Sequence, residues 1–313
     1  MRIVFMGTPD FAIPTLEAIY KSEDSVVGVF TQPDKPKGRG YTLTPPPVKV
    51  FATEHGIPVY QPTTLRSDES LELIKSLSPD LIVVVAYGKI LPPAILELPP
   101  HGCINVHGSL LPKYRGAAPM QRAIIDGEKV TGVTTMYMAE GLDTGDMLLK
   151  AEFPIAPDAN FETVHDGLAS LGAELLIKTV EAIKAGTAVR IPQDHALATH
   201  TSKIEKSDCE INFALDANTI HDLVRGLSPI PLAFTHTPDG KLLKIIKTAV
   251  SGRSGEGAKA GEIIALDEAK GCFSVACGNG AVDVFAVLPE GKGRMGAADF
   301  IRGRKISKGD ILG

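Results

Sequence analysis

The sequence predicts an α/β fold with a mostly parallel sheet, followed by a small β-barrel. Residues 1–184 alternate short apolar runs with amphipathic runs, which is the pattern of parallel strands with helices on the faces of the sheet. This alternation stops in residues 185–206, a stretch that predicts an exposed linker. Residues 207–313 then show one helical segment and several alternating segments separated by Gly-rich turns, which predicts a compact β domain.

The spacing of apolar residues places the individual elements. In the first region it predicts strands at 3–6, 26–30, 81–85 and 103–106, and helices at 11–20, 48–55 and 68–77. The last helix of this region, at 161–184, is expected to face a core with Val164, Leu168, Leu171, Leu175 and Leu176, which recur at helical spacing. In the second region we expect a helix at 216–226 and strands at 241–250, 261–266, 272–278 and 281–288.

Composition restricts the class of protein and its partners. The 313 residues suffice for one large or two ordinary domains, and the formal net charge of −5 means that a nucleic acid would need a local basic patch to bind. No apolar run approaches the ~20 residues that span a bilayer, and no signal-peptide pattern precedes the first strand, so we expect a cytoplasmic protein. Cys103, Cys209, Cys272 and Cys277 lack zinc-site spacing, so we expect reduced thiols and no metal.

The segment from Asn105 to Pro119 carries the strongest chemical signal in the chain. Asn105 and His107 lie two residues apart in a short apolar strand, so their side chains share one face of the sheet. Ligands of open α/β sheets bind just beyond the carboxyl ends of strands. Because Asn can donate a hydrogen bond to a developing oxyanion and His can move a proton at neutral pH, this pair favours carbonyl chemistry.

The turn after the first strand argues against a dehydrogenase. Gly7-Thr8-Pro9-Asp10 occupies the position where a dinucleotide-binding fold carries Gly-x-Gly-x-x-Gly, and that fingerprint is absent. The sequence therefore does not support a nicotinamide cofactor.

Two basic clusters interrupt the acidic background. The first is the loop at 32–40 together with Tyr41 and Lys49, and it is longer than the ~2–6 residues usual for such a connection. Long basic loops with an aromatic residue suit phosphates and unpaired bases, although a solvated surface insertion is the alternative. The second cluster, opposed only by Asp299, consists of Lys292, Arg294, Arg302, Arg304, Lys305 and Lys308.

Ser109-Leu110-Leu111-Pro112 with Arg115-Gly116, directly after Asn105 and His107, resembles the folate-dependent formyltransferases. The resemblance implies a Rossmann-like sheet, a C-terminal OB-like barrel, 10-formyltetrahydrofolate as the formyl donor and no metal. Members of this family often place a Trp near residues 228–231, whereas this chain contains no Trp. Further matching segments are Gly7–Phe11, the basic loop, Ala86–Pro92 and Gly141–Asp146.

The resemblance also implies roles for individual residues. It adds Asp143 to Asn105 and His107 as a catalytic residue, although Asp143 and Asp146 also suit an ordinary turn. Residues expected to bind the folate are Ser109, Leu110, Leu111 and Pro112, with Tyr87, Gly88, Ile90 and Leu91 from the 86–91 loop. Residues expected to bind tRNA are Lys35, Lys37, Arg39 and Tyr41 in the basic loop, and Arg302, Arg304 and Lys305 near the C-terminus.

The reaction implied is formyl transfer from 10-formyltetrahydrofolate to the α-amino group of methionyl-initiator tRNA, which gives N-formylmethionyl-tRNA for translation initiation. Residues 1–184 would form the catalytic domain, 185–206 the linker and 207–313 the tRNA-binding domain of a monomer that does not contact a membrane. One alternative is a folate-dependent formyltransferase acting on an amino-sugar nucleotide, which should lack the basic loop. The other is a non-catalytic RNA-binding protein, which leaves Asn105, His107 and Asp143 without a purpose.

Overall fold

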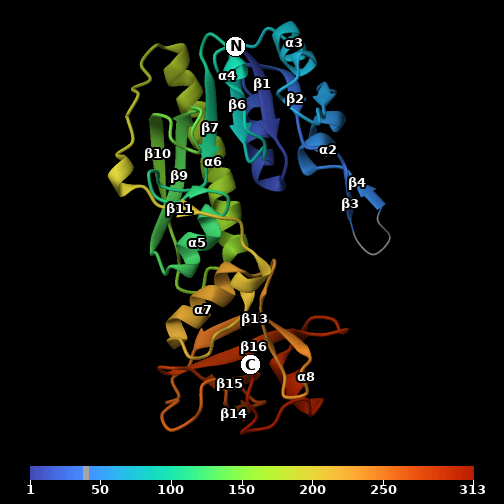
Figure 1. The fold of residues 1–313 in the computed structure, drawn as a ribbon, viewed down its shortest axis with the longest axis vertical. Coiled ribbons are helices and arrows are strands. Elements are labelled where there is room, and N and C mark those ends of the chain that lie inside the picture. Colours follow the sequence, from blue (N-terminus) through green and yellow to red (C-terminus); the bar gives the residue numbers. More distant parts are fainter. Residues whose placement is uncertain (38–41) are drawn as a thin grey trace. The chain divides into compact units, whose positions relative to one another are not determined.

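The structure, a computed structural model, describes residues 1–37 and 42–313 (Figure 1). The chain divides into two compact units, each with an apolar cluster of its own. Neither unit is one continuous stretch of chain, and the predicted domain boundaries stay a prediction. The first unit comprises Met1–Gly116, Thr131–Phe153 and His165–Thr201, and the second comprises Ala117–Val130, Pro154–Val164 and Ser202–Gly313.

A seven-stranded sheet with the order β10-β9-β7-β6-β1-β2-β5 forms the first unit. β1 runs parallel to β2 and β6, β2 runs parallel to β5, and β6 runs parallel to β7, whereas β9 is antiparallel to β7. The predicted mostly parallel sheet is therefore confirmed. Its strands are β1 (Arg2–Gly7), β2 (Ser25–Phe30), β5 (Val59–Tyr60), β6 (Leu81–Val85), β7 (Cys103–His107), β9 (Val130–Tyr137) and β10 (Met147–Pro154).

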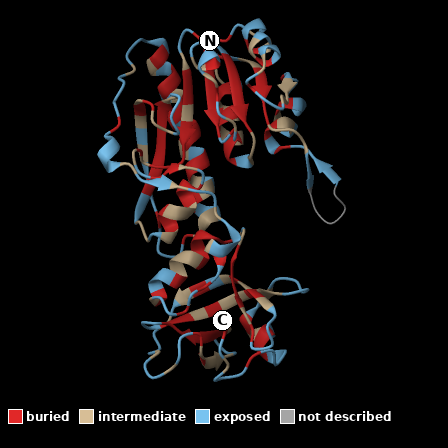
Figure 2. Ribbon diagram, viewed as in Figure 1, coloured by how far each residue is buried: buried red, intermediate tan, exposed pale blue. Residues whose placement is uncertain are grey.

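Four helices of the first unit lie close to the positions that the apolar spacing predicts, and a short helix at 93–96 was not predicted. Leu168 and Leu176 of α6 are fully buried, which stabilises the fold by about 1.5–3 kcal/mol per side chain relative to exposure. Figure 2 shows the same burial along the central strands, and every residue of β6 is buried. The helices are α1 (Ile13–Tyr20), preceded by the short 3₁₀ helix η1 (Asp10–Ala12), α2 (Pro47–Glu54), α3 (Asp68–Ser76), α4 (Pro93–Leu96) and α6 (Phe161–Lys184).

The basic loop contains a short antiparallel hairpin of β3 (Lys35–Lys37) and β4 (Thr42–Thr44). Asp34 lies at its base and accepts hydrogen bonds from Lys49 Nζ and Gln61 Nε2, each at 2.8 Å. The hydrogen bond from Lys49 holds the pKa of Asp34 below its usual value. Lys49 therefore neutralises a carboxylate of the same loop, and its charge is not free for a phosphate.

The second unit is a small antiparallel β domain with the strand order β12-β13-β16-β15-β14, and β17 pairs with β16. The small β domain predicted for this region is confirmed. Its elements are α5 (Pro119–Ile125), η3 (Lys206–Cys209), α7 (Ala217–Gly226), β12 (Ala233–His236), β13 (Leu242–Val250), β14 (Ile263–Asp267), β15 (Cys272–Ala276), β16 (Ala281–Pro289), β17 (Met295–Gly296) and α8 (Ala297–Arg302).

The predicted linker is partly built into the first unit. It contains η2 (His195–Leu197) and β11 (His200–Thr201), and β11 pairs in parallel with β8 (Arg115–Gly116). Most side chains from 187 to 200 are exposed, but Gln193 is only 6% exposed.

Three predicted absences concern the cysteines, metals and membranes. All four cysteines are free and buried. Among the described residues, no three His, Cys, Asp or Glu side chains are grouped so that they could hold a metal ion. No helix in the described part of the chain has the length and apolar character to cross a membrane.

Candidate active site

The carboxyl end of β7 brings Asn105 and His107 to one face of the sheet. β7 lies between β6 and β9, so the polar side chains at its end are held by a paired backbone on both sides. His107 is 6% exposed and Asn105 is half-buried. Within the described residues the Asn105 carboxamide makes no hydrogen bond. Its amide group is therefore free to donate to a ligand.

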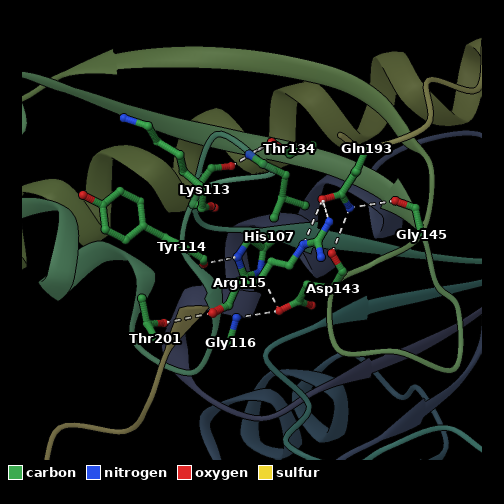
Figure 3. A network of polar contacts seen from close by, with 12 residues as sticks. His107, Lys113, Tyr114, Arg115, Gly116, Thr134, Asp143, Gly145, Gln193 and Thr201 are labelled. Atoms are coloured by element: carbon green, nitrogen blue, oxygen red, sulfur yellow. Dashed lines mark hydrogen bonds and ion pairs between the residues drawn. The ribbon is translucent and has the colours of Figure 1, made fainter. Parts of the chain in front are cut away.

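Both ring nitrogens of His107 face oxygen atoms (Figure 3). Nε2 lies 2.9 Å from the carbonyl oxygen of Tyr114, and because a carbonyl can only accept, Nε2 carries the hydrogen. Nδ1 lies 3.7 Å from Oδ2 of Asp143, which is beyond hydrogen-bond length but close enough for attraction when the ring is charged. The structure thus brings the predicted His107 and Asp143 together.

A backbone amide fixes the carboxylate of Asp143. Oδ2 accepts a hydrogen bond of 2.8 Å from the Gly116 N–H, and Asp143 itself has a φ of 51°, in the left-handed region. Gly116 has a φ of 111°, and a Cβ added there would lie 2.2 Å from the carbonyl oxygen of Thr201. Only glycine lets the chain pass Thr201 and still present its amide to Asp143.

The buried side-chain amide of Gln193, which no sequence motif indicates, forms hydrogen bonds with both of these loops. Gln193 Oε1 accepts hydrogen bonds from Nε and Nη2 of Arg115 at 3.0 and 2.6 Å. Gln193 Nε2 donates to the carbonyl oxygens of Asp143 and Gly145, both at 2.8 Å. Gln193 lies in the predicted linker, where the sequence lacks any periodicity that would indicate a buried polar residue.

The loop expected to bind folate is held by internal hydrogen bonds. The Ser109 hydroxyl donates to the carbonyl of Lys113 at 2.7 Å, and Thr134 Oγ1 donates to the carbonyl of Ser109 at 2.7 Å. Lys150 Nζ donates to the carbonyl of Leu111, whose side chain packs with Met136 and Met147. Ser109 and Leu111 are buried, whereas Leu110 and Pro112 remain half-buried at the surface of the loop.

The 86–91 loop is likewise divided between buried and exposed residues. Tyr87 and Leu91 belong to an apolar cluster, whereas Gly88 and Ile90 are exposed. Thr8 Oγ1 and Gln32 Nε2 both donate to the carbonyl of Tyr87 at 3.0 Å. Burial raises the pKa of Tyr87 to about 12, so its phenol stays neutral at physiological pH. Tyr87 thus holds the loop in place through its buried side chain and its hydrogen-bonded carbonyl.

The residues expected to bind tRNA are divided between the two units. Lys35 is exposed on β3, and Lys37 ends that strand. Arg39 and Tyr41 lie outside the described residues. Arg302, Arg304 and Lys305 are exposed at and after the end of α8, and Arg302 forms an ion pair with Asp299. The charge of Arg302 is therefore partly neutralised.

Comparison with known proteins identifies the family of this chain. Residues 1–180 match the family model "Formyl transferase", and residues 203–305 match "Formyl transferase, C-terminal domain". The methionyl-tRNA formyltransferase of Geotalea uraniireducens is 50% identical over 313 residues, which cover 100% of this chain and 98% of that protein.

Solved structures with low sequence identity share the fold. The N-formyltransferase from Helicobacter canadensis, solved with folinic acid and dTDP-3-aminofucose, has a TM-score of 0.66 at 19% identity, covering 91% of this chain and 98% of that one. HypX from Aquifex aeolicus, solved with tetrahydrofolic acid, has a TM-score of 0.63 at 18% identity, covering 100% of this chain. The match covers 50% of HypX, so this chain spans about half of its length.

The fold and both matched domains define a formyltransferase. Identity near 50% over the full chain narrows this class further. The chain belongs to the methionyl-tRNA formyltransferase family.

Proposed function

We propose that this enzyme transfers the formyl group of 10-formyltetrahydrofolate to the α-amino group of methionyl-initiator tRNA, and so makes N-formylmethionyl-tRNA for translation initiation. The observation that carries this proposal is the 50% identity to the Geotalea uraniireducens enzyme over nearly its full length. In the reaction the α-amino nitrogen bonds to the formyl carbon, the bond from that carbon to N10 breaks, and tetrahydrofolate leaves with a proton on N10. A cytoplasmic monomer is part of the same proposal.

The acceptor amine needs little activation. An α-amino group has a pKa of about 7.7–8.0, so a useful fraction is neutral and nucleophilic near pH 7. Its attack on the formyl carbon places negative charge on the formyl oxygen. Stabilising this oxyanion is the main task, and it requires donors fixed before the reaction begins. The free carboxamide of Asn105, at the end of a paired strand, suits this role.

His107 and Asp143 handle charge and protons in this proposal. Because Nε2 already donates to the Tyr114 carbonyl, the protonated imidazole of His107 donates to the same oxyanion through Nδ1 and delivers that proton as the intermediate collapses. The carboxylate of Asp143, 3.7 Å from Nδ1, orients the ring and stabilises positive charge that develops on it. Asp143 also accepts the proton that the amine loses, directly or through a water molecule. No step assigned to these residues requires a metal.

We assign the folate to the surface formed by the loop at 109–112 and the loop at 86–91. Structural neighbours crystallised with folates, tetrahydrofolic acid in HypX and folinic acid in the Helicobacter canadensis enzyme, support a folate donor. Of the residues expected to bind the folate, the accessible ones in this chain are Leu110, Pro112, Gly88 and Ile90. Ser109, Leu111, Tyr87 and Leu91 lie behind them and hold the loops in place.

For the tRNA we retain the basic loop as the proposed contact with the acceptor end, with Lys35, Lys37, Arg39 and Tyr41. The exposed Arg304 and Lys305 form a second proposed contact, together with Arg302, whose charge Asp299 reduces. Basic side chains of this kind bind phosphates and release counterions, so they give affinity that depends on salt.

The acceptor can be tested directly. With 10-formyltetrahydrofolate as donor, the purified enzyme should formylate methionyl-tRNA and leave an amino-sugar nucleotide unreacted, as followed by release of tetrahydrofolate and by mass spectrometry of the acceptor. Formylation of the sugar amine with no reaction of methionyl-tRNA would replace the proposed function by its alternative.

Replacing Asn105 tests the oxyanion role. Asn105→Ala should lower kcat by about 10²–10³-fold, because the amide meets charge that exists only in the transition state. Binding of methionyl-tRNA, measured by titration, should stay nearly unchanged. Asn212→Ala, at an exposed turn of the second unit, is the matched control and should keep full activity. A loss of tRNA affinity with unchanged kcat would remove Asn105 from the chemistry.

The contribution of the basic loop shows in the salt dependence of kcat/KM for methionyl-tRNA. Each phosphate contact contributes a slope of about −0.7 to −0.9 in a plot of log affinity against log salt. Lys35→Ala should therefore flatten the slope and lower kcat/KM at low salt. Lys75→Ala, an exposed lysine of α3 paired with Glu72, is the control and should keep the wild-type slope. Equal slopes in all three proteins would exclude Lys35 from tRNA recognition.

A further inference from the structure

The loop that carries Asp143 must turn back along the sheet. β9 is antiparallel to β7, with Thr134 opposite His107 and Tyr137 opposite Ile104. A strand rises ~3.3 Å per residue, so β9 ends roughly 10 Å from His107 along the strand direction. Asp143 follows six residues after Tyr137 and nevertheless lies beside His107. The loop therefore needs an anchor that keeps it folded back.

Gln193 makes four hydrogen bonds to its neighbours, and two of them anchor this loop. Its Oε1 accepts two hydrogen bonds from Arg115, and its Nε2 donates to the carbonyls of Asp143 and Gly145. Figure 3 shows the amide between the guanidinium and the loop. A guanidinium can only donate and a carbonyl can only accept, so the flipped amide would place like groups against each other on both sides. The four contacts thus permit a single orientation of the amide.

Arg115 fixes the other side of this arrangement. It is 3% exposed, and among the described residues it forms no ion pair with a carboxylate. A buried charge is costly unless hydrogen bonds compensate it, and Gln193 together with Nδ1 of His195 accepts its donors. This requirement keeps the Gln193 oxygen turned to Arg115, and hence the Gln193 amino group turned to the loop.

We propose that Gln193 is a positioning residue for formyl transfer: it holds the carbonyls of residues 143 and 145, and so keeps Asp143 in its left-handed conformation with its carboxylate against His107 and the Gly116 amide. This inference rests on the proposed function for its catalytic consequence. A left-handed φ at a non-glycine residue persists only where the surroundings enforce it, and the bond from Gln193 to the Asp143 carbonyl acts at that residue.

Two substitutions separate this role from simple support of Arg115. Gln193→Met keeps the approximate size and removes all four contacts. Gln193→Glu keeps an oxygen for Arg115, adds a favourable charge there, and turns a second carboxylate oxygen against the two loop carbonyls. If Gln193 acts through Asp143, both variants should lower kcat by about 10²-fold, as expected for a misplacement near 1 Å, with the KM for methionyl-tRNA nearly unchanged. Thr187→Val, exposed in the same segment, should behave as wild type.

A second readout does not depend on activity. The Gly116 amide is bound to the Asp143 carboxylate, so release of the loop should speed its hydrogen exchange. We expect faster exchange at Gly116 in both Gln193 variants, and unchanged exchange at the central strand β6.

Specific outcomes would overturn the inference. Wild-type kcat in Gln193→Glu would show that Gln193 serves only Arg115, and so would unchanged exchange at Gly116 in that variant. Because Glu retains the contact with Arg115, this test stands even if Gln193→Met fails to fold. The two proposals can also fail separately. If the wild-type enzyme does not formylate methionyl-tRNA, but exchange at Gly116 is faster in the Gln193 variants than in wild type, the proposed function is contradicted and the positioning role of Gln193 remains.

Discussion

The hydrogen bond from the Gly116 amide to the Asp143 carboxylate joins the two loops that build the site. One loop continues from β7 and carries the Tyr114 carbonyl that accepts from His107, and the other returns from β9 with Asp143. His107 sits between them, with one ring nitrogen toward each loop. The distance of 3.7 Å between Nδ1 of His107 and the carboxylate of Asp143 therefore depends on the backbone of β7 and of these two loops, and not on the two side chains alone.

The segment after α6 also contacts the two loops that flank His107. The hydroxyl oxygen of Thr199 accepts a hydrogen bond from the Tyr114 amide at 2.8 Å, and the carbonyl oxygen of Thr199 accepts one from the Arg115 amide at 2.9 Å. With Gln193, the same segment thus contacts both loops that flank His107. A chain region that contributes no residue to the proposed chemistry fixes the geometry in which that chemistry takes place.

Periodicity and motifs were sufficient to predict the fold class, but they did not predict the contacts of the segment after α6 with these loops. The helix at 161–184 is predicted at its full length because its apolar stripe is long, and Asn105 and His107 follow from alternation in one strand. Gln193 could not be predicted, because its partners lie 48 and 50 residues away in sequence and are backbone carbonyls, which carry no residue signature. β8 and β11 have two residues each, too few for any periodic pattern.

A double-mutant cycle on His107 and Asp143 tests most directly whether they act as one unit. The values of kcat/KM for formyl transfer to methionyl-tRNA are compared among wild type, His107→Ala, Asp143→Ala and the double variant. Residues that work as a unit lose their effect together, so the double variant should be little worse than the more damaged single variant. If the two losses multiply in full, Asp143 belongs to its turn alone and the proposed coupling between the two loops is wrong.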